Sequence, residues 1–301
     1  MKGTNMDRRM FLKSAVVAGA VATLPSAAFA EESGSTPQEK AVLKLSSQES
    51  RLPGRNLKEK VENLAKYGGI GIELHSPNLE NRIKEAQDAI AGTEVKISAI
   101  CAADGPYIVS DEAQRRKAID NAKRLLTAAG ELGSTGVIMV PAFNDAKNVV
   151  MGKEGRAILI DVLKELGEHA VQAKSRMMLE PLNRGEAWFL RQLADAASIC
   201  RDVNSPGIMM MGDFYHMRIE ETSDMGGFVS AGKYLHHVHL ASRKRVMPGQ
   251  DERSFVDGFR GLKMIGYKDY CSLECGCEGK PEEEIAKSFS FLKRQWEEAV
   301  V

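Results

Sequence analysis

The sequence predicts a single-domain α/β fold, a (β/α)8 barrel, and three observations favour it. From residue 41 onward, eight short apolar runs each precede a stretch with helical periodicity. Most of these runs are almost continuously apolar, as in parallel strands that are buried on both faces. Residues 41–301 also come close to the ~250 residues typical of such a barrel. A doubly wound parallel sheet is the alternative arrangement, and no internal boundary divides the segment into two domains.

The elements follow one another in a regular order. The expected strands occupy residues 41–45, 70–74, 95–101, 136–140, 177–179, 208–211, 235–240 and 270–273. Helical apolar faces follow within residues 57–64, 79–90, 119–126, 158–166, 190–200, 226–233, 255–262 and 285–296. The weakest helical pattern is that of 226–233, and the last helix starts near Pro281, a residue favoured in the first helical turn.

Residues 1–30 form a separate region with the layout of an export signal. Arg8 and Arg9 precede Phe-Leu-Lys, a mildly apolar run follows, and Ala28-Phe29-Ala30 has the small-residue pattern of a cleavage site. The segment resembles a twin-arginine signal, with an ordinary secretory signal or membrane anchor as the alternative. This resemblance implies cleavage after Ala30, a periplasmic location, and folding with any cofactor before export. Residues 31–40 are expected to be a linker and residues 41–301 the barrel.

Charge and cysteine content narrow the classes of function. The chain has 41 basic and 41 acidic residues, so it lacks the basic surface typical of nucleic-acid binding. No apolar run after the signal is long enough to cross a bilayer, and we expect no membrane contact after cleavage. The odd number of cysteines, 5, excludes a fully paired disulfide framework. Buried free thiols are the favoured interpretation, although a disulfide among Cys271, Cys275 and Cys277 or a soft-metal pair stays open.

Four strongly polar residues close four successive predicted strands. They are Glu180, Asp213, His239 and Glu274. Their spacing is about one strand-helix unit each time, so all four should lie at the carboxyl-end rim, where barrel active sites form. Three carboxylates in one pocket repel each other unless a cation lies between them. Oxygen ligands with one imidazole suit one divalent ion, Mn²⁺ first, with Co²⁺ or Mg²⁺ as alternatives.

At this point the sequence resembles a known family. The motifs that carry the resemblance are Gly71-Ile72-Glu73-Leu74, Leu179-Glu180-Pro181-Leu182-Asn183, Asp213-x-x-His216, His237-Val238-His239 and Leu273-Glu274. Together they are similar to the xylose isomerase-like barrel superfamily, in particular its sugar isomerase and epimerase branch, which includes ketose 3-epimerases. The resemblance extends over essentially all of residues 41–301.

The resemblance assigns roles to individual residues. It implies that Glu180, Asp213, His239 and Glu274 bind the metal. It implies substrate contacts for Glu186, His216 and Arg245. These residues follow Glu180, Asp213 and His239 in the sequence at the spacing that the family pattern has. We also expect substrate contacts from Glu73, which lies near the end of the second strand, with a buried polar network at the barrel mouth as the alternative. Trp188, just after Glu186, is expected to stack on a sugar face, with core packing as the alternative. His237 should lie one layer deeper than His239 in the same strand, where we expect it to pack in the interior or to contact the ligands from behind.

This residue set predicts a proton-transfer mechanism on a sugar or keto-sugar. A metal ion acidifies the C–H next to a carbonyl and stabilises the resulting enediolate. Glu180 and Glu274, three strands apart, would remove and return the proton as catalytic acid and base. Transfer at one carbon gives an epimer, and transfer to the next carbon gives an aldose-ketose isomer.

Other functions are compatible with parts of this pattern. A 3-keto-glycoside lyase would start with the same proton abstraction and then expel the aglycone. A non-catalytic sugar-binding barrel predicts an incomplete ligand set, whereas all four ligands are present. DNA repair enzymes of the endonuclease IV type need further histidines that the segment after the seventh strand lacks. A homo-oligomer is compatible with the sequence, which leaves the identity of the sugar open.

Overall fold

The computed structural model describes residues 40–301, which form a closed barrel of eight parallel strands. Each strand pairs with the next along the chain, and β1 pairs with β8 to close the barrel. The strands are β1 (Lys44–Gln48), β2 (Gly71–His75), β3 (Lys96–Cys101), β4 (Val137–Met139), β5 (Met177–Leu179), β6 (Ile208–Asp213), β7 (Leu235–Leu240) and β8 (Tyr270–Leu273). The predicted (β/α)8 fold is therefore confirmed.

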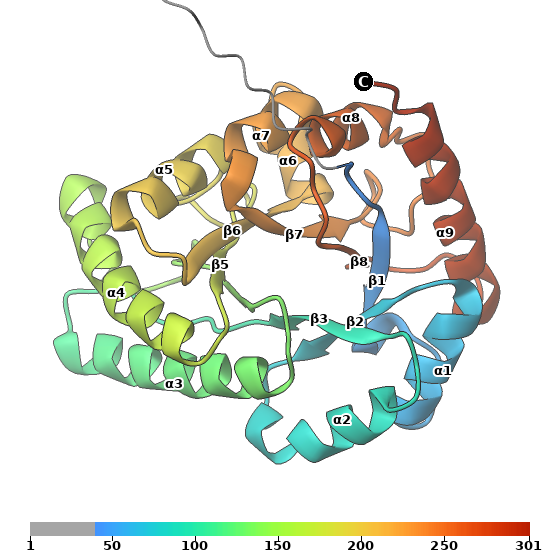
Figure 1. Cartoon of the computed structure of the whole chain (residues 1–301). Helices are drawn as coiled ribbons and strands as arrows, with labels where there is room; N and C mark the ends of the chain where they lie inside the picture. Colours follow the sequence, from blue (N-terminus) through green and yellow to red (C-terminus); the bar gives the residue numbers. More distant parts are fainter. Residues whose placement is uncertain (1–39) are drawn as a thin grey trace, which may run out of the picture. The chain divides into compact units, whose positions relative to one another are not determined.

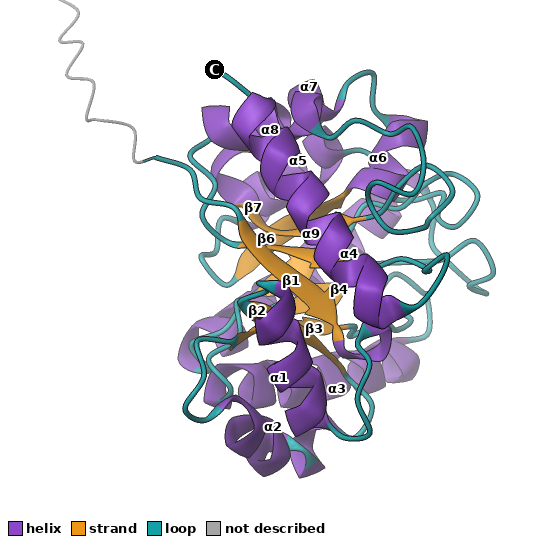
Figure 2. Cartoon of the chain, turned by 90° about the vertical axis from the view of Figure 1, so that its right-hand side faces the viewer, coloured by secondary structure: helices purple, strands orange, loops and turns teal. Residues whose placement is uncertain are grey.

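The helices form a ring around the barrel, as both views show (Figures 1 and 2). They are α1 (Leu57–Tyr67), α2 (Ile83–Ile90), α3 (Glu112–Glu131), α4 (Gly152–Gln172), α5 (Leu193–Val203), α6 (Phe214–Glu220), α7 (Asp224–Ala231), α8 (Val256–Met264) and α9 (Pro281–Glu298). Three short 3-10 helices join them, at Glu49–Arg51, Leu79–Asn81 and Gly232–Tyr234. Within residues 40–301, no helix is both long and apolar enough to cross a membrane.

The buried apolar residues of the described chain form three clusters, one of them much larger than the others. The largest cluster fills the space between strands and helices, and Val61, Leu64 and Phe289 are among its fully or almost fully buried members. A small second cluster consists of Ala99, Ile138, Met178 and Met211, which come from four strands of the barrel. This apolar packing explains why most strands could be recognised as continuous apolar runs.

Strand β1 is the element whose position differs most from the prediction. The sequence placed it at residues 41–45, whereas it spans Lys44–Gln48. Its last three residues, Ser46, Ser47 and Gln48, are polar but almost completely buried. Ser46 Oγ lies 2.7 Å from Ser98 Oγ of β3, so a hydrogen bond satisfies both buried hydroxyls. Polar residues therefore end this strand, and an apolar pattern alone misses them.

Helix α6 is an element that the sequence analysis did not predict. It begins at Phe214, directly after β6, with no intervening loop. Asp213 is its N-cap, and Asp213 Oδ1 accepts a hydrogen bond of 2.6 Å from the backbone N–H of Tyr215. The sharp transition fixes the Asp213 side chain at the end of the strand.

Residues 1–39 lie outside the described part of the chain, so the predictions for the export signal and for almost all of the linker stay predictions. All five cysteines lie within the described part and are free. Burial raises the pKa of the Cys275 thiol to about 12, which keeps it protonated and unreactive.

Candidate metal centre

Four side chains from four neighbouring strands converge at the carboxyl ends of the strands. Glu180 follows β5, Asp213 ends β6, His239 lies near the end of β7, and Glu274 follows β8. Each offers one ligand atom, and these atoms all lie within 4.8 Å of one another. The structure thus brings together the four residues that the sequence singled out.

The cluster has buried polar atoms that lack partners. His239 Nδ1 lies 3.6 Å from Glu180 Oε1 and 3.5 Å from Glu274 Oε2. This nitrogen and Asp213 Oδ2 are buried and have no hydrogen-bond partner among residues 40–301. Buried polar atoms seldom stay unsatisfied in proteins. A divalent cation would satisfy both, and three carboxylates with one imidazole fit Mn²⁺, Co²⁺ or Mg²⁺.

The carboxylates of the cluster differ in their proton affinity. Burial raises the pKa of Glu180 to about 7, and the negative charges of Glu274 and Asp104 contribute. Burial and the charge of Glu274 also raise the pKa of Asp213 well above its usual value. Burial likewise raises the pKa of Glu274, but His239 and Arg245 outweigh it and bring that pKa to about 2. Without a cation the cluster therefore retains protons that metal binding must displace.

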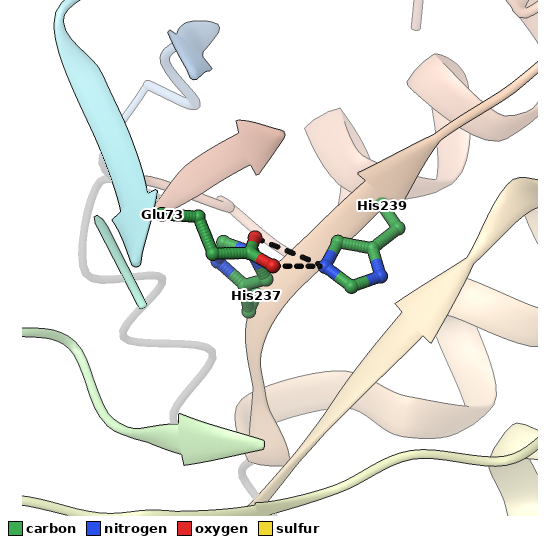
Figure 3. A group of neighbouring side chains, drawn as sticks. All are labelled: Glu73, His237 and His239. Atoms are coloured by element: carbon green, nitrogen blue, oxygen red, sulfur yellow. Dashed lines mark hydrogen bonds and ion pairs between the residues drawn. The ribbon is translucent and has the colours of Figure 1, made fainter. Parts of the chain in front are cut away.

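Glu73 is a buried neighbour of this cluster and belongs to a polar network, one of the two roles that the sequence left open for it. The residue belongs to β2, has no exposed surface, and points between His237 and His239 (Figure 3). Its carboxylate lies 2.9 Å from His237 Nε2 and 3.0 Å from His239 Nε2. His237 and His239 lie two residues apart on the same face of β7, and the closure of the barrel brings Glu73 of β2 to both of them.

Arg245 connects the cluster with Glu186. Its Nη2 lies 3.0 Å from Glu274 Oε2, and its Nη1 lies 3.4 Å from Glu186 Oε1. The guanidinium also stacks over the ring of Tyr215, 4.8 Å from the ring centroid. Its backbone has a φ of 57°, a conformation in which few residues other than glycine occur. The loop after β7 thus turns back so that Arg245 reaches the cluster.

His216 lies next to Asp213 and is held in place by Asn183. Its Nδ1 accepts a hydrogen bond of 3.2 Å from the backbone N–H of Asn183. Its proton must therefore be on Nε2, which lies 3.5 Å from Asp213 Oδ2. Burial and the charge of Arg245 lower the pKa of His216 to about 3, so the ring is neutral. The Asn183 side chain also donates to Glu186, at 2.9 Å, and so ties Glu186 into the same network.

Trp188 lies apart from this network. Its ring packs edge-on against Phe189, with ring centroids 5.4 Å apart. Trp188 also lines a surface cavity of about 280 Å³ together with residues at the starts of α4 and α5. Trp188 therefore packs on Phe189 and on the apolar core between strands and helices.

Two residues at the site had no assigned role in the sequence analysis. Gln48 Nε2, at the end of β1, donates to Glu73 Oε1 at 2.9 Å and to Glu274 Oε1 at 3.1 Å. Asp104, three residues after β3, accepts a hydrogen bond from the backbone N–H of Val140, and burial raises its pKa. The residues that close the strands would have included Gln48 if the end of β1 had been placed correctly.

Comparisons with known proteins agree with this arrangement. The family model described as xylose isomerase-like TIM barrel matches residues 61–295. The 3-dehydro-D-guloside 4-epimerase of Escherichia coli K12 is 28% identical over 260 residues, which cover 83% of this chain and 99% of that protein. A D-psicose 3-epimerase of Enterocloster bolteae is 30% identical over 123 residues, which cover 40% of this chain and 41% of the relative.

Solved structures give the same result. The crystal structure of 3-keto-D-glucoside 4-epimerase from E. coli superposes with a TM-score of 0.76 at 26% identity and covers 84% of this chain and all (100%) of that chain. A D-psicose 3-epimerase crystallised in the presence of D-fructose shares the fold, with a TM-score of 0.75 at 18% identity and coverage of 84% and 99%. Because the family model spans most of the barrel, the chain belongs to the xylose isomerase-like TIM barrel family.

Proposed function

We propose that this protein is a divalent-metal-dependent epimerase of keto-sugars, which inverts the carbon next to a carbonyl group. The observation that carries the proposal is the convergence of Glu180 and Glu274 on His239 from different strands. Two carboxylates around one buried centre can exchange a proton with a carbon placed between them.

Glu180, Asp213, His239 and Glu274 would hold the metal through the atoms that meet in the cluster. When bound, a divalent cation supplies Lewis-acid chemistry, because it stabilises negative charge on the oxygens next to the reacting carbon. Mn²⁺ is our first expectation, and Co²⁺ and Mg²⁺ are the alternatives.

The protein residues divide the proton transfer between them. One glutamate takes the proton as the C–H bond breaks, and the other donates a proton to the opposite face of the same carbon. Arg245 and Gln48 each bind one oxygen of Glu274, so its orientation and its ionised form are both favoured. Glu186, His216 and Arg245 line the same network and are expected to position the sugar hydroxyl groups.

The expected substrates are 3-keto-glycosides ahead of free ketoses. The relative with near full-length similarity is named for a dehydro-glycoside substrate, whereas the psicose epimerase match spans less than half of each chain. A lyase that expels the aglycone would begin with the same proton transfer. The test below therefore has to distinguish lyase activity from epimerase activity.

The test is incubation of the protein with Mn²⁺ in D₂O, with methyl 3-keto-glucoside in one sample and D-fructose in another. We expect NMR to show deuterium at a carbon beside the carbonyl, together with the epimer of the keto-glycoside. Removal of Mn²⁺ with a chelator should abolish both. Release of methanol would show that the protein is a lyase instead. The absence of deuterium exchange with both sugars would contradict the proposal.

We also propose that residues 1–30 direct export by the twin-arginine route, on the basis of the Arg8-Arg9 pair and the small-residue cleavage site. Mass spectrometry of protein from the periplasm should then give a chain that starts at Glu31. Replacement of both arginines by lysine should retain the protein in the cytoplasm, whereas replacement of Lys2 and Lys13 by arginine should not.

A further inference from the structure

Glu73 is a buried carboxylate that takes no part in the proposed proton transfer. It is 0% exposed and lies on β2, which β1 separates from β8 in the closed barrel. Its two oxygens accept hydrogen bonds from three side chains: His237, His239 and Gln48. An ionised carboxylate can accept all of these bonds, and it has no proton to donate.

These contacts fix where the protons of His239 are. Because the Glu73 carboxylate only accepts, His239 must donate to it through Nε2, at 3.0 and 3.1 Å from the two oxygens. In neutral His239 the other nitrogen, Nδ1, then carries the free electron pair. That nitrogen is the buried, unpartnered atom that faces Glu180 and Glu274. The tautomer that Glu73 selects is thus the one that presents a ligand atom to the cluster.

Gln48 extends this arrangement to a second ligand. One amide nitrogen of Gln48 donates both to Glu73 Oε1 and to Glu274 Oε1. The other oxygen of Glu274, Oε2, faces His239 and Arg245. Glu73 and Gln48 together therefore orient His239 and Glu274 through hydrogen bonds.

We propose that Glu73 is a positioning residue that, with Gln48, holds His239 and Glu274 in the orientation needed to bind a divalent cation. The inference rests on the metal-binding part of the proposed function. Carboxylates that accept a proton from a ligating histidine fix its ring and tautomer, and their loss commonly lowers metal affinity 10–100-fold.

In the arrangement that we propose, Glu73, His237 and His239 form a hydrogen-bonded group and not a second metal site. Glu73 Oε2 lies 2.9 Å from His237 Nε2, and both carboxylate oxygens lie 3.0–3.1 Å from His239 Nε2, the separation of direct hydrogen bonds (Figure 3). Each of these nitrogens carries a hydrogen in that arrangement, so neither presents an electron pair to a cation.

The test uses the variant Glu73→Gln in the full barrel. Glutamine keeps the shape of the side chain, but it offers one acceptor oxygen and adds an N–H₂ donor that would face an N–H group. At least one histidine must then change its tautomer or lose its partner. We expect isothermal titration to show a Kd for Mn²⁺ that is 10–100-fold higher than in the wild type.

The matched control is Ser98→Ala. This change also removes a buried hydrogen bond inside the barrel, to Ser46, but it touches neither Glu73 nor His239. Its affinity for Mn²⁺ should equal that of the wild type. Circular dichroism and thermal unfolding of both variants show whether each is folded before titration.

The tautomer can also be observed without any mutation. In wild-type protein with ¹⁵N-labelled histidine and bound Zn²⁺, long-range ¹H–¹⁵N spectra should show His239 protonated at Nε2 only. A His239 ring protonated at Nδ1, or a Glu73→Gln variant that binds Mn²⁺ as tightly as the wild type, would overturn the inference. A wild type that binds no divalent metal would instead contradict the proposed function.

Discussion

At the scale of single residues, the two glutamates of the cluster lie in different electrostatic surroundings. Burial brings the pKa of Glu180 to about 7, whereas Arg245 and His239 overcome burial to bring that of Glu274 to about 2. The two glutamate side chains are identical, but their proton affinities differ because their neighbours differ. Such a difference suits a pair that has to exchange the roles of acid and base.

We predict that Glu180→Gln and Glu274→Gln each reduce kcat by 10²-fold or more, because an amide cannot accept the proton. Solvent-deuterium exchange into the substrate, followed by NMR, is the measurement. The control is Glu165→Gln, which changes a carboxylate on α4 that pairs with Arg116 and Lys123 away from the cluster. Full activity in the double glutamine variant would refute the two-carboxylate mechanism.

Arg245 leads to a second prediction at this scale. It contacts Glu186 and Glu274 at once and stacks on Tyr215, a combination that needs the flat guanidinium. Arg245→Lys should therefore lower kcat/KM roughly 10–100-fold, mainly through a higher KM. Steady-state kinetics measure this, with Arg243→Lys, an exposed neighbour in the same loop, as the control. Equal kinetics in the two variants would show that Arg245 does not position the substrate.

Much of this site could be predicted from the sequence, since polar residues that close apolar strands meet at one rim. Glu180, Asp213, His239 and Glu274 were identified in this way, and the structure brings them within 4.8 Å of one another. The hydrogen bonds of Glu73 could not be predicted. The sequence gives the face of the strand on which Glu73 lies, but not which side chains of other strands it reaches. That information exists only once β2 and β7 face each other.

At the scale of elements, the pattern of apolar residues predicted the ends of most strands to within one or two residues. It failed at β1, where buried serines pair across the interior, and at α6, which starts without a loop. At β1 the buried serine has its partner on another strand, and at α6 the last residue of the strand caps the helix that follows it. The alternation of apolar and polar residues gives neither the distant partner nor the direct change from strand to helix.

An ion pair between elements gives the third prediction. Glu49, in the 3-10 helix after β1, is almost buried and binds Arg82, just before α2, through both oxygens. Arg82→Ala leaves that carboxylate without its partner and should cost roughly 1–3 kcal/mol of unfolding free energy at pH 7. Lys84→Ala, which removes an exposed pair with Asp88, should cost about 0.5 kcal/mol or less.

The effect of Arg82→Ala should depend on pH in one direction. Burial raises the pKa of Glu49, but the bonds from Arg82 and His75 outweigh it and lower that pKa below its usual 4.5. A lowered pKa in the folded state stabilises the protein above the unfolded-state value and loses this effect as the pH falls. Urea unfolding at pH 7 and at pH 4 should therefore show a smaller difference between wild type and variant at pH 4. A difference that grows in acid would contradict this account.

At the scale of the whole molecule, the metal binding that we propose would couple the cluster to stability. A ligand that binds only the folded state stabilises it by about 2.7 kcal/mol at a concentration 100 times its Kd. For a domain of this size, Mn²⁺ should thus raise the Tm by roughly 5 °C or more. Differential scanning calorimetry with Mn²⁺ and with a chelator measures the shift. The same shift in Asp213→Asn would show that the ion binds elsewhere.

The pairing of β1 with β8 also determines when this site can exist during synthesis. Gln48 donates to Glu274, which lies 226 positions later in the chain, and Glu73 accepts from His237, 164 positions later. A nascent chain that still lacks β8 has neither the fourth ligand nor the strand that closes the barrel. Capture of the proposed metal ion would therefore come late, after translation of the last strand and release of the chain from the ribosomal exit tunnel. A truncated chain cannot acquire the complete site, so a bound metal ion would mark chains whose synthesis is complete.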